Sequence, residues 1–389
     1  MKRIALLLGQ DLGYCRDILR GIQAYSLHKL DWVFRDAPPD RRFLAPLREW
    51  RPHGIIAHLF NPELVESLKR CQRPVVNTTS TLADCSFPLV EVDHEQVGQM
   101  AAQYFIDRGY TNFGYYGSSR AGFSVCREQG FRHIVEQYGG TVYSCHADYL
   151  PRPSFETSWR RVDRKVQHWL RKLNKPVAIF CSNDVPARDL AETCVASGFK
   201  VPEQVALLGV DNDDAECRLA RPQLSSVEIP SEQIGYEAAR ILDQILSGEP
   251  APTKPIFLPP IRVVSRQSTD TTAVLDHDVR NALAYIRSHY SMHIGVEQVS
   301  RGIAVGRRNL ERKMSKHLGR TVLQEIQRMR IEAAQQLLAE TDLSMASVAV
   351  QVGFSNARRM ATIFQQQVGT TPSKLRRDMR ANFRGRSGV

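Results

Sequence analysis

The chain alternates short apolar segments with helical segments over its first 265 residues, and this alternation constrains the fold more than any other feature. The apolar segments are Ile4–Gly9, Gly54–Phe60, Pro74–Thr79, Phe113–Gly117, Val177–Ser182 and Val205–Val210. Helical periodicity occupies Tyr14–His28, Gln96–Arg108, Gly122–Tyr138 and Val185–Gly198. Continuous apolar strands that alternate with helices indicate parallel sheets covered on both faces. With further extended runs at Leu224–Pro230 and Ile256–Ser265, the pattern predicts two similar α/β lobes.

Polar side chains stand where several of these strands end. They are Gln10 and Asp11, then Asn183 and Asp184, then Asp211 and Asn212. In such folds a ligand binds beyond the carboxyl ends of the strands. Carboxylates and amides hydrogen-bond hydroxyl groups well, so the sequence predicts a hydroxyl-bearing ligand. The alternative is that Asn183 or Asp211 only caps the helix that follows it.

Basic charge is concentrated in the last part of the chain. Residues 280–389 contain 19 Lys and Arg against 7 Asp and Glu, a net charge of +12, whereas the whole chain carries +11. Residues 1–279 are therefore nearly neutral. This asymmetry favours a polyanion as the partner of the tail alone, the alternative being a solvated basic face.

A proline-rich segment at 248–255 and a polar stretch from Arg266 to Thr272 mark a change of pattern. After them the periodicity is wholly helical. We predict an α/β domain at 1–265, a linker at 266–277 and an all-α domain at 278–389.

The helical part divides into pieces of the length that two helix-turn-helix units require. The first unit turns at Ala304–Gly306, and its second helix presents outward residues near its start: Arg307, Arg308, Asn309, Glu311 and Arg312. A longer helix from Val322 to about Glu340 is predicted to hold the two units at a fixed separation.

The second unit turns at Gly353 and restarts at Ser355, a good helix N-cap. Its next helix is predicted to expose Asn356, Arg358, Arg359 and Thr362. Arg, Asn and Glu side chains match the hydrogen-bonding edges of guanine, adenine and cytosine. The alternative for about half of these residues in both units is contact with phosphate or with nothing.

Residues 330–376 resemble the signature of the arabinose-regulator family of transcription factors. The resemblance rests on the run RIEAAQQLL, the turn Gly353–Ser355, Phe364 and the segment Gly369–Arg376. It implies a sequence-specific transcriptional regulator whose two recognition helices enter adjacent major-groove segments. By position, the resemblance assigns the base contacts to Arg308, Glu311, Arg312, Asn356, Arg358 and Thr362.

Three positions depart from that family's pattern. Ala304 replaces a usual glycine, Gly306 replaces a Ser or Thr cap, and Met360 replaces a commoner aromatic residue. A missing cap and a non-glycine residue at positive φ each cost up to about 1 kcal/mol. We therefore expect the first unit to be looser than the second.

Nearly all of residues 1–265 resembles the periplasmic-binding-protein fold used by effector domains of the lactose-repressor family. The segments 124–139, 178–198 and 201–242 carry the resemblance. It implies a two-lobed sugar sensor in which Arg127, Asn183 and Asp211 hydrogen-bond sugar hydroxyls. A sensor followed by such a tail resembles xylose-operon activators, which implies D-xylose or another aldose as effector, with Arg16 as a further contact.

The expected function is therefore activation of sugar catabolic genes in the cytoplasm. The expected partners are promoter DNA, a small sugar, a second copy of the chain in a homodimer, and RNA polymerase. The alternatives are another carbohydrate, repression or, more remotely, a sugar-processing enzyme. The sequence shows no glycine-rich nucleotide loop, zinc-protease motif or nucleophile elbow, so we expect no enzyme activity and no cofactor. Its eight cysteines form no CxxC pair, and no apolar run approaches the roughly 20 residues of a membrane span, so neither a metal site nor a membrane partner is expected.

Overall fold

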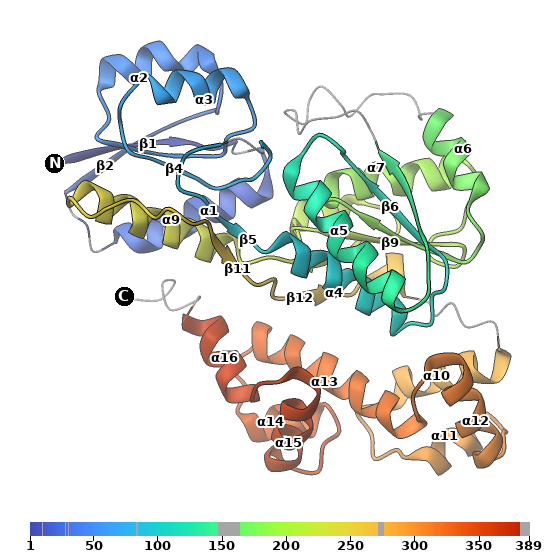
Figure 1. Ribbon diagram of the computed structural model, residues 1–389. Helices are drawn as coiled ribbons and strands as arrows, with labels where there is room; N and C mark the ends of the chain where they lie inside the picture. Colours follow the sequence, from blue (N-terminus) through green and yellow to red (C-terminus); the bar gives the residue numbers. More distant parts are fainter. Residues whose placement is uncertain are drawn as a thin grey trace. The chain divides into compact units, whose positions relative to one another are not determined.

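In the computed structural model the chain divides into two compact units, one made of residues 1–106 and 110–271 and the other of residues 107–109 and 272–389 (Figure 1). The structure describes residues 1–9, 11–27, 29, 31–82, 85–146, 164–270 and 276–381. The first unit contains parallel sheets and the second contains helices. The predicted fold class is confirmed.

The amino-terminal lobe is built on a four-stranded parallel sheet in the order β2-β1-β3-β4. Its strands are β1 (Lys2–Leu7), β2 (Trp32–Ala37), β3 (Gly54–Ala57) and β4 (Val75–Asn77). Helices cover both faces, with α2 (Leu44–Trp50) and α3 (Pro62–Lys69) on one and α1 (Gly13–Ser26) and α9 (Ser231–Leu246) on the other (Figure 1). Glycine lets α1 and α9 approach closely, because a Cβ at Gly21 would lie 1.8 Å from the carbonyl oxygen of Glu232.

The carboxyl-terminal lobe contains a six-stranded sheet in the order β12-β10-β9-β8-β6-β7, in which only β12 runs antiparallel to its neighbour. The strands are β6 (Phe113–Gly117), β7 (Val142–His146), β8 (Val177–Cys181), β9 (Val205–Val210), β10 (Ser225–Glu228) and β12 (Arg262–Val264). One face packs against α4 (His94–Ile106) and α5 (Gly122–Gln137). The other packs against α6 (Arg164–Lys172), α7 (Asp184–Ala196) and α8 (Asp214–Leu219). Every residue of β8 and β9 is buried, as the apolar runs predicted.

The chain crosses between the lobes three times. It leaves the first sheet through β5 (Val90–Val92), returns from β10 to α9, and crosses again from β11 (Ile256–Leu258) to β12. Strands β5 and β11 pair in parallel as a small sheet between the lobes (Figure 1). Because of these crossings, the carboxyl ends of the strands in both main sheets face the same space between the lobes.

Strands β2 and β7 were not predicted, and both lie at an edge of their sheets. Each is only partly buried, with exposed residues such as Arg35 and Tyr143. An edge strand needs no continuous apolar run, so the pattern that revealed β8 and β9 is absent there.

The linker expected at 266–277 does not begin at Arg266. Residues Gln267–Thr269 form a short 3-10 helix in which Ser268 and Thr269 are buried. Ser268 Oγ donates to the carbonyl oxygen of Leu207 at 2.6 Å and accepts the backbone N–H of Ser225 at 2.9 Å. The polar residues that suggested a linker therefore hydrogen-bond to the neighbouring strands β9 and β10. Residues 271–275 lie outside the described part of the chain.

The helical unit contains two helix-turn-helix motifs joined by one long helix. The helices are α10 (His277–His289), α11 (Val296–Gly302), α12 (Arg307–Leu318), α13 (Val322–Glu340), α14 (Met345–Gln351), α15 (Ala357–Val368) and α16 (Pro372–Ala381). Leu310 and Met314 belong to a core around α10–α12, and Phe364 belongs to a second core around α14–α16. Helix α13 supplies Ile326 to the first core and Leu338 to the second. It therefore joins the two motifs, as predicted.

The turns of the two motifs differ in strain and capping. Ala304 adopts a φ of 55°, and Gly306 precedes α12 without a side-chain cap, as the departures from the family pattern predicted. In the second turn Gly353 adopts a φ of 88°. The prediction that Ser355 caps α15 was wrong, because Asn356 is the cap and its Oδ1 accepts the N–H of Arg359 at 2.8 Å.

Replacing Ala304 with Gly is expected to stabilise the helical unit by about 1 kcal/mol, because a left-handed backbone costs alanine more than glycine. Gly353→Ala is expected to destabilise it by at least about 1 kcal/mol, since a Cβ there would lie 2.5 Å from the carbonyl oxygen of Tyr290. Hydrogen exchange of the amides in α10–α16 under increasing urea measures both effects. The control is Ala346→Gly in α14, where the same substitution should be destabilising. If Ala304→Gly destabilises the helical unit as much as Ala346→Gly does, the left-handed backbone at Ala304 carries no strain.

Candidate ligand pocket and DNA-binding helices

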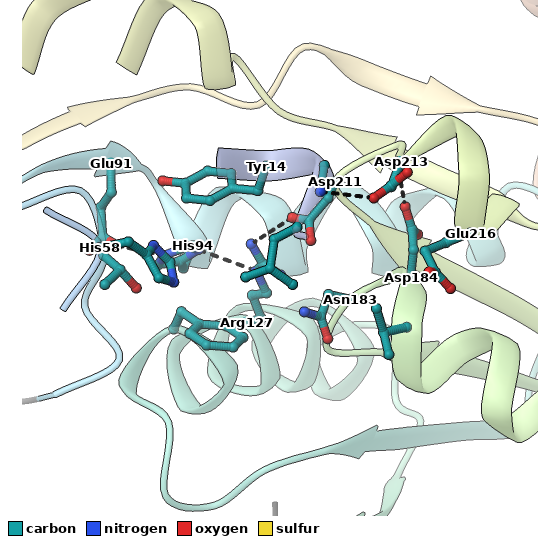
Figure 2. Close-up of a pocket in the computed structure, with 15 residues that line it drawn as sticks. Tyr14, His58, Glu91, His94, Arg127, Asn183, Asp184, Asp211, Asp213 and Glu216 are labelled. Carbon is teal, nitrogen blue, oxygen red and sulfur yellow. Dashed lines mark hydrogen bonds and ion pairs between the residues drawn. The ribbon is translucent and has the colours of Figure 1, made fainter. Parts of the chain in front are cut away.

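A pocket lies between the two lobes of the α/β unit and encloses about 640 Å³ of empty space, part of it open to solvent (Figure 2). The amino-terminal lobe and the crossing strand β5 line it with Leu12, Gly13, Tyr14, His58, Thr79 and Glu91. The carboxyl-terminal lobe lines it with His94, Phe123, Arg127, Asn183, Asp184, Val185, Asp211, Asp213 and Glu216. Three of the four residues that we predicted to bind a ligand, Arg127, Asn183 and Asp211, thus surround one pocket.

Asp211 directly follows β9, and its backbone is unusual for a residue other than glycine. Its φ is 105°, and its N–H donates to the carbonyl oxygen of Val227 at 3.0 Å. Such conformations persist where the surrounding structure fixes them, and they gather at functional sites. Burial raises the pKa of the Asp211 carboxyl to about 7, although the guanidinium of Arg127, 3.6 Å away, opposes the shift.

Arg127 projects from α5 into the centre of this group (Figure 2), and its side chain is only 4% exposed. Its Nη1 donates to the carbonyl oxygen of Ser182 at the end of β8, and its Nε donates to Nδ1 of His94 at 3.2 Å. Its guanidinium also lies 5.1 Å from the centre of the Phe123 ring. The cation is therefore buried, but it is hydrogen-bonded and paired with a carboxylate, as a buried charge requires.

His94 carries this network onward to Glu91. Because Nε of Arg127 only donates, Nδ1 of His94 must accept, so the imidazole is neutral and its Nε2 donates to Glu91 Oε2 at 2.9 Å. Burial lowers the pKa of His94, consistent with the neutral ring. Burial alone would raise the pKa of Glu91, but contact with His94 and the N–H of Ser80 lowers it. The pocket thus has one buried cation between two carboxyl groups.

Asp213 links the two lobes beside the pocket. Its Oδ1 accepts the N–H of Ala215 and caps α8, while its Oδ2 accepts the N–H of Gly13 at the start of α1, each at 3.0 Å. A Cβ at position 13 would lie 2.2 Å from that Oδ2, so glycine permits the close approach. Arg16 does not line the pocket, contrary to the expected direct contact. Its Nη2 lies 3.5 Å from Oδ2 of Asp213 instead.

The other polar residues that follow the strands have different roles. Asn183 precedes α7 but makes no capping hydrogen bond with its side chain, which leaves the amide facing the pocket (Figure 2). Asp184 is buried and structural, since its carboxylate accepts from Ser226 Oγ at 2.7 Å and from the N–H of Asp213 at 2.9 Å. Asp11 and Asn212 do not line the pocket, and Gln10 lies outside the described residues.

Sequence reasoning missed most of the pocket wall supplied by the amino-terminal lobe and the crossing strand. Tyr14, His58 and Glu91 come from α1, the end of β3 and β5, and His94 begins α4. The one available signal was the pair Glu91 and His94, three residues apart at the start of a helix. Nothing local indicated that this pair would meet Arg127.

In the first helix-turn-helix motif three predicted contacts are exposed arginines: Arg307, Arg308 and Arg312. Arg307 pairs loosely with Glu297 at 3.4 Å, and Arg312 donates to Asn309 Oδ1 at 2.9 Å. Glu311 is only partly exposed, and its carboxylate accepts the N–H of Val322 at 3.3 Å. It therefore already serves the start of α13.

In the second motif Arg358, Arg359 and Thr362 are exposed on α15. Thr362 Oγ1 donates to the carbonyl oxygen of Arg358 at 3.1 Å, and Asn356 uses its Oδ1 as the helix cap. The arginines are thus the side chains of this helix best placed to reach outward. Among the described residues no cluster of three or more His, Cys, Asp or Glu could hold a metal ion, and no helix there is long and apolar enough to cross a membrane.

Two family matches agree with the two units. Residues 102–269 match the periplasmic binding protein-like domain, and residues 299–378 match a helix-turn-helix domain. The chain is a transcriptional regulator that joins a periplasmic-binding-protein-like domain to a DNA-binding helix-turn-helix domain. It is not an enzyme, because the relatives that match nearly its whole length are transcription regulators.

The chain is similar over nearly its whole length to the xylose operon regulatory proteins of Escherichia coli (strain K12) and Haemophilus influenzae. Each is 28% identical to this chain. The alignment with the Escherichia coli protein covers 96% of both chains. The alignment with the Haemophilus influenzae protein covers 96% of this chain and 98% of that protein. A solved structure described as xylose-binding transcription activator xylR is 26% identical, with a TM-score of 0.60 over 97% of this chain and 98% of that one. A regulator from Alkaliphilus metalliredigens, solved with D-xylulofuranose, shares the fold of the first unit at 18% identity and a TM-score of 0.57, covering 70% of this chain and 100% of that one.

Proposed function

We propose that this regulator binds a small neutral sugar between its lobes and then activates sugar catabolic genes, with D-xylose as the first candidate effector. The placement of Arg127, Asn183 and Asp211 around one pocket carries the proposal. Sugar hydroxyls both donate and accept hydrogen bonds, so they suit a guanidinium, an amide and a carboxylate together. The names of the full-length relatives also favour xylose.

The charges of the pocket favour an uncharged ligand. The cation of Arg127 is engaged by Asp211, by His94 and by the carbonyl oxygen of Ser182. An anionic ligand would meet Asp211, Glu91 and Asp213, and among the described residues that line the pocket there is no second cation to receive it. We therefore place the effector among aldoses rather than sugar acids or sugar phosphates.

Arg16 has an indirect part in this proposal. It pairs with Asp213, whose carboxylate joins the start of α1 in one lobe to the start of α8 in the other. Arg16 and Asp213 thus favour the closed arrangement of the lobes, and ligand binding shifts the population toward that arrangement.

The helical domain binds promoter DNA through α12 and α15 in this proposal. We assign outward contacts to Arg307, Arg308 and Arg312 in the first motif and to Arg358, Arg359 and Thr362 in the second. Asn356 and Glu311 are left with supporting roles because their oxygens serve helix ends. The regulator acts in the cytoplasm as a homodimer and recruits RNA polymerase.

A hydrogen-bonded path joins the ligand pocket to the end of the α/β unit. Asn212 follows Asp211 and also has a positive φ of 54°. Its Oδ1 accepts from Arg266 Nη2 at 2.7 Å, and the N–H of Arg266 donates to Ser225 Oγ at 2.7 Å. Residues 266–269 immediately precede the segment that leads to α10 in the sequence. A change at Asp211 can therefore reach the start of that segment through two side chains, those of Asn212 and Arg266.

Asp211→Ala is expected to weaken D-xylose binding about ten- to a hundredfold and to abolish the sugar response, because a charged hydrogen-bond partner is lost. DNA affinity without sugar should stay unchanged. Calorimetry with a panel of aldoses measures the first effect, and in vitro transcription measures the second and shows whether the sugar activates or represses. Glu203→Ala, an exposed carboxylate of the same lobe, is the control. Unaltered affinity of Asp211→Ala for the sugar that the wild type binds would refute the assignment.

Arg266→Lys is expected to leave sugar affinity within about threefold of wild type while removing most of the sugar-induced change in DNA affinity, which typically amounts to about 5- to 150-fold. Lysine keeps the charge but loses the planar fork that reaches both Asn212 and the carbonyl oxygen of Leu224. The matched control is Arg262→Lys, since Arg262 pairs with Glu228 instead. Equal losses of sugar affinity and of response would show that Arg266 only supports the pocket.

Arg358→Ala is expected to cost about 1 to 3 kcal/mol of DNA binding and to relax preference at one base pair, because α15 is well capped and holds Arg358 near its start. Arg308→Ala and Arg312→Ala should have smaller sequence-specific effects, since α12 follows a strained and uncapped turn. Selection from a randomised operator library at two salt concentrations distinguishes base readers from phosphate contacts. Arg280→Ala in α10, outside both motifs, is the control. Uniform weakening across all sequences would identify these arginines as phosphate contacts.

A further inference from the structure

His58 is a buried polar residue that lines the pocket from the amino-terminal lobe. It follows β3 in the amino-terminal lobe, where its N–H donates to the carbonyl oxygen of Leu7 at 2.9 Å. The residue is 6% exposed and lines the pocket. Its Nδ1 is buried without a hydrogen-bond partner among the described residues. Buried polar atoms are nearly always paired, so an unpaired nitrogen in a ligand pocket points to a ligand.

The surroundings of His58 keep its ring neutral and fixed. Burial lowers the pKa of His58 to about 4, although Glu91 and Asp11 oppose the shift. The ring of Tyr14 packs edge-on against it at 5.6 Å, and Tyr14 is held in turn because its hydroxyl donates to the carbonyl oxygen of Thr78 at 2.6 Å. A neutral imidazole has one donor and one acceptor nitrogen, which suits a hydroxyl group.

His58 stands apart from the polar residues of the other lobe. Figure 2 shows His58 and Glu91 on one side of Arg127, with Asn183 and Asp211 toward the other. The hydrogen bonds of Arg127 and His94 occupy the region between the two groups. A ligand that satisfies both groups must carry hydroxyls at two separated positions.

We propose that His58 forms a second hydroxyl-binding subsite, supplied by the amino-terminal lobe, and that the effector is a polyol whose separated hydroxyls connect this subsite with Asn183 and Asp211. This inference rests on the proposed sugar-sensing function and specifies how the ligand is chosen. A site built to hydrogen-bond a hydroxyl rejects the analogue that lacks it, because the buried group is then left unpaired. A ligand that engages both subsites also holds the two lobes together.

The test combines deletions in the protein with deletions in the ligand, measured by calorimetry on the full chain. The ligands are D-xylose, its monodeoxy derivatives and 1,5-anhydroxylitol, which lacks the anomeric hydroxyl. In the wild type, removal of the hydroxyl that contacts His58 should weaken binding about ten- to a hundredfold. His58→Phe should weaken D-xylose binding by a similar factor. This variant should also bind D-xylose and the analogue that lacks the His58-contacting hydroxyl equally well. His58→Gln restores a hydrogen-bonding group and should recover part of the affinity and of the discrimination.

The matched control is His53→Phe in the same lobe. His53 accepts the N–H of Arg3 at 2.8 Å and does not line the pocket, so this variant should lose stability without losing ligand discrimination. If His58→Phe does not fold, the comparison of His58→Gln with wild type across the same ligands decides the question. Wild-type affinity and discrimination in the folded variants would overturn the subsite while leaving the sugar-sensing function intact. Failure of the wild type to bind any aldose would overturn both.

Discussion

The buried guanidinium of Arg127 is the interaction on which the pocket depends. A cation removed from water is costly unless hydrogen bonds and an opposite charge surround it. Its partners come from separate parts of the chain: Ser182 directly follows β8, Asp211 directly follows β9, and His94 begins α4. The ends of two central strands and the start of a helix are therefore arranged around one charge. Through His94 the same network reaches Glu91, which lies on a strand that crosses between the lobes.

Part of the carboxyl-terminal half of the pocket could be predicted because it follows from strand position. Asn183 and Asp211 stand directly after buried parallel strands, and the ends of such strands meet at one edge of a sheet. Arg127 came from family resemblance alone, since a single arginine within α5 has no distinguishing local pattern. The expected place of Arg16 was wrong in detail because its partner Asp213 lies about two hundred residues away in the sequence.

The amino-terminal half of the pocket could not be predicted, because tertiary structure rather than local sequence brings its residues together. His58 and Glu91 meet the other lobe only after the chain has crossed between the sheets. The features of the helical unit could be predicted more fully, because the spacing of its helices and the residues of its turns are local properties of the sequence. The strain at Ala304 and the missing cap at Gly306 were therefore predicted correctly, whereas the choice between Ser355 and Asn356 as cap depended on where α15 begins.

Helix α13 has a consequence for how the binding preference of such a regulator changes in evolution. Its 19 residues supply side chains to both helix-turn-helix cores, so it fixes the second motif relative to the first. Each inserted residue would turn the second motif by about 100° and shift it by about 1.5 Å. One insertion would therefore redirect the exposed arginines of α15 relative to those of α12. Substitutions on α12 and α15 can change the exposed side chains of each motif, but the spacing between the two motifs is fixed by α13.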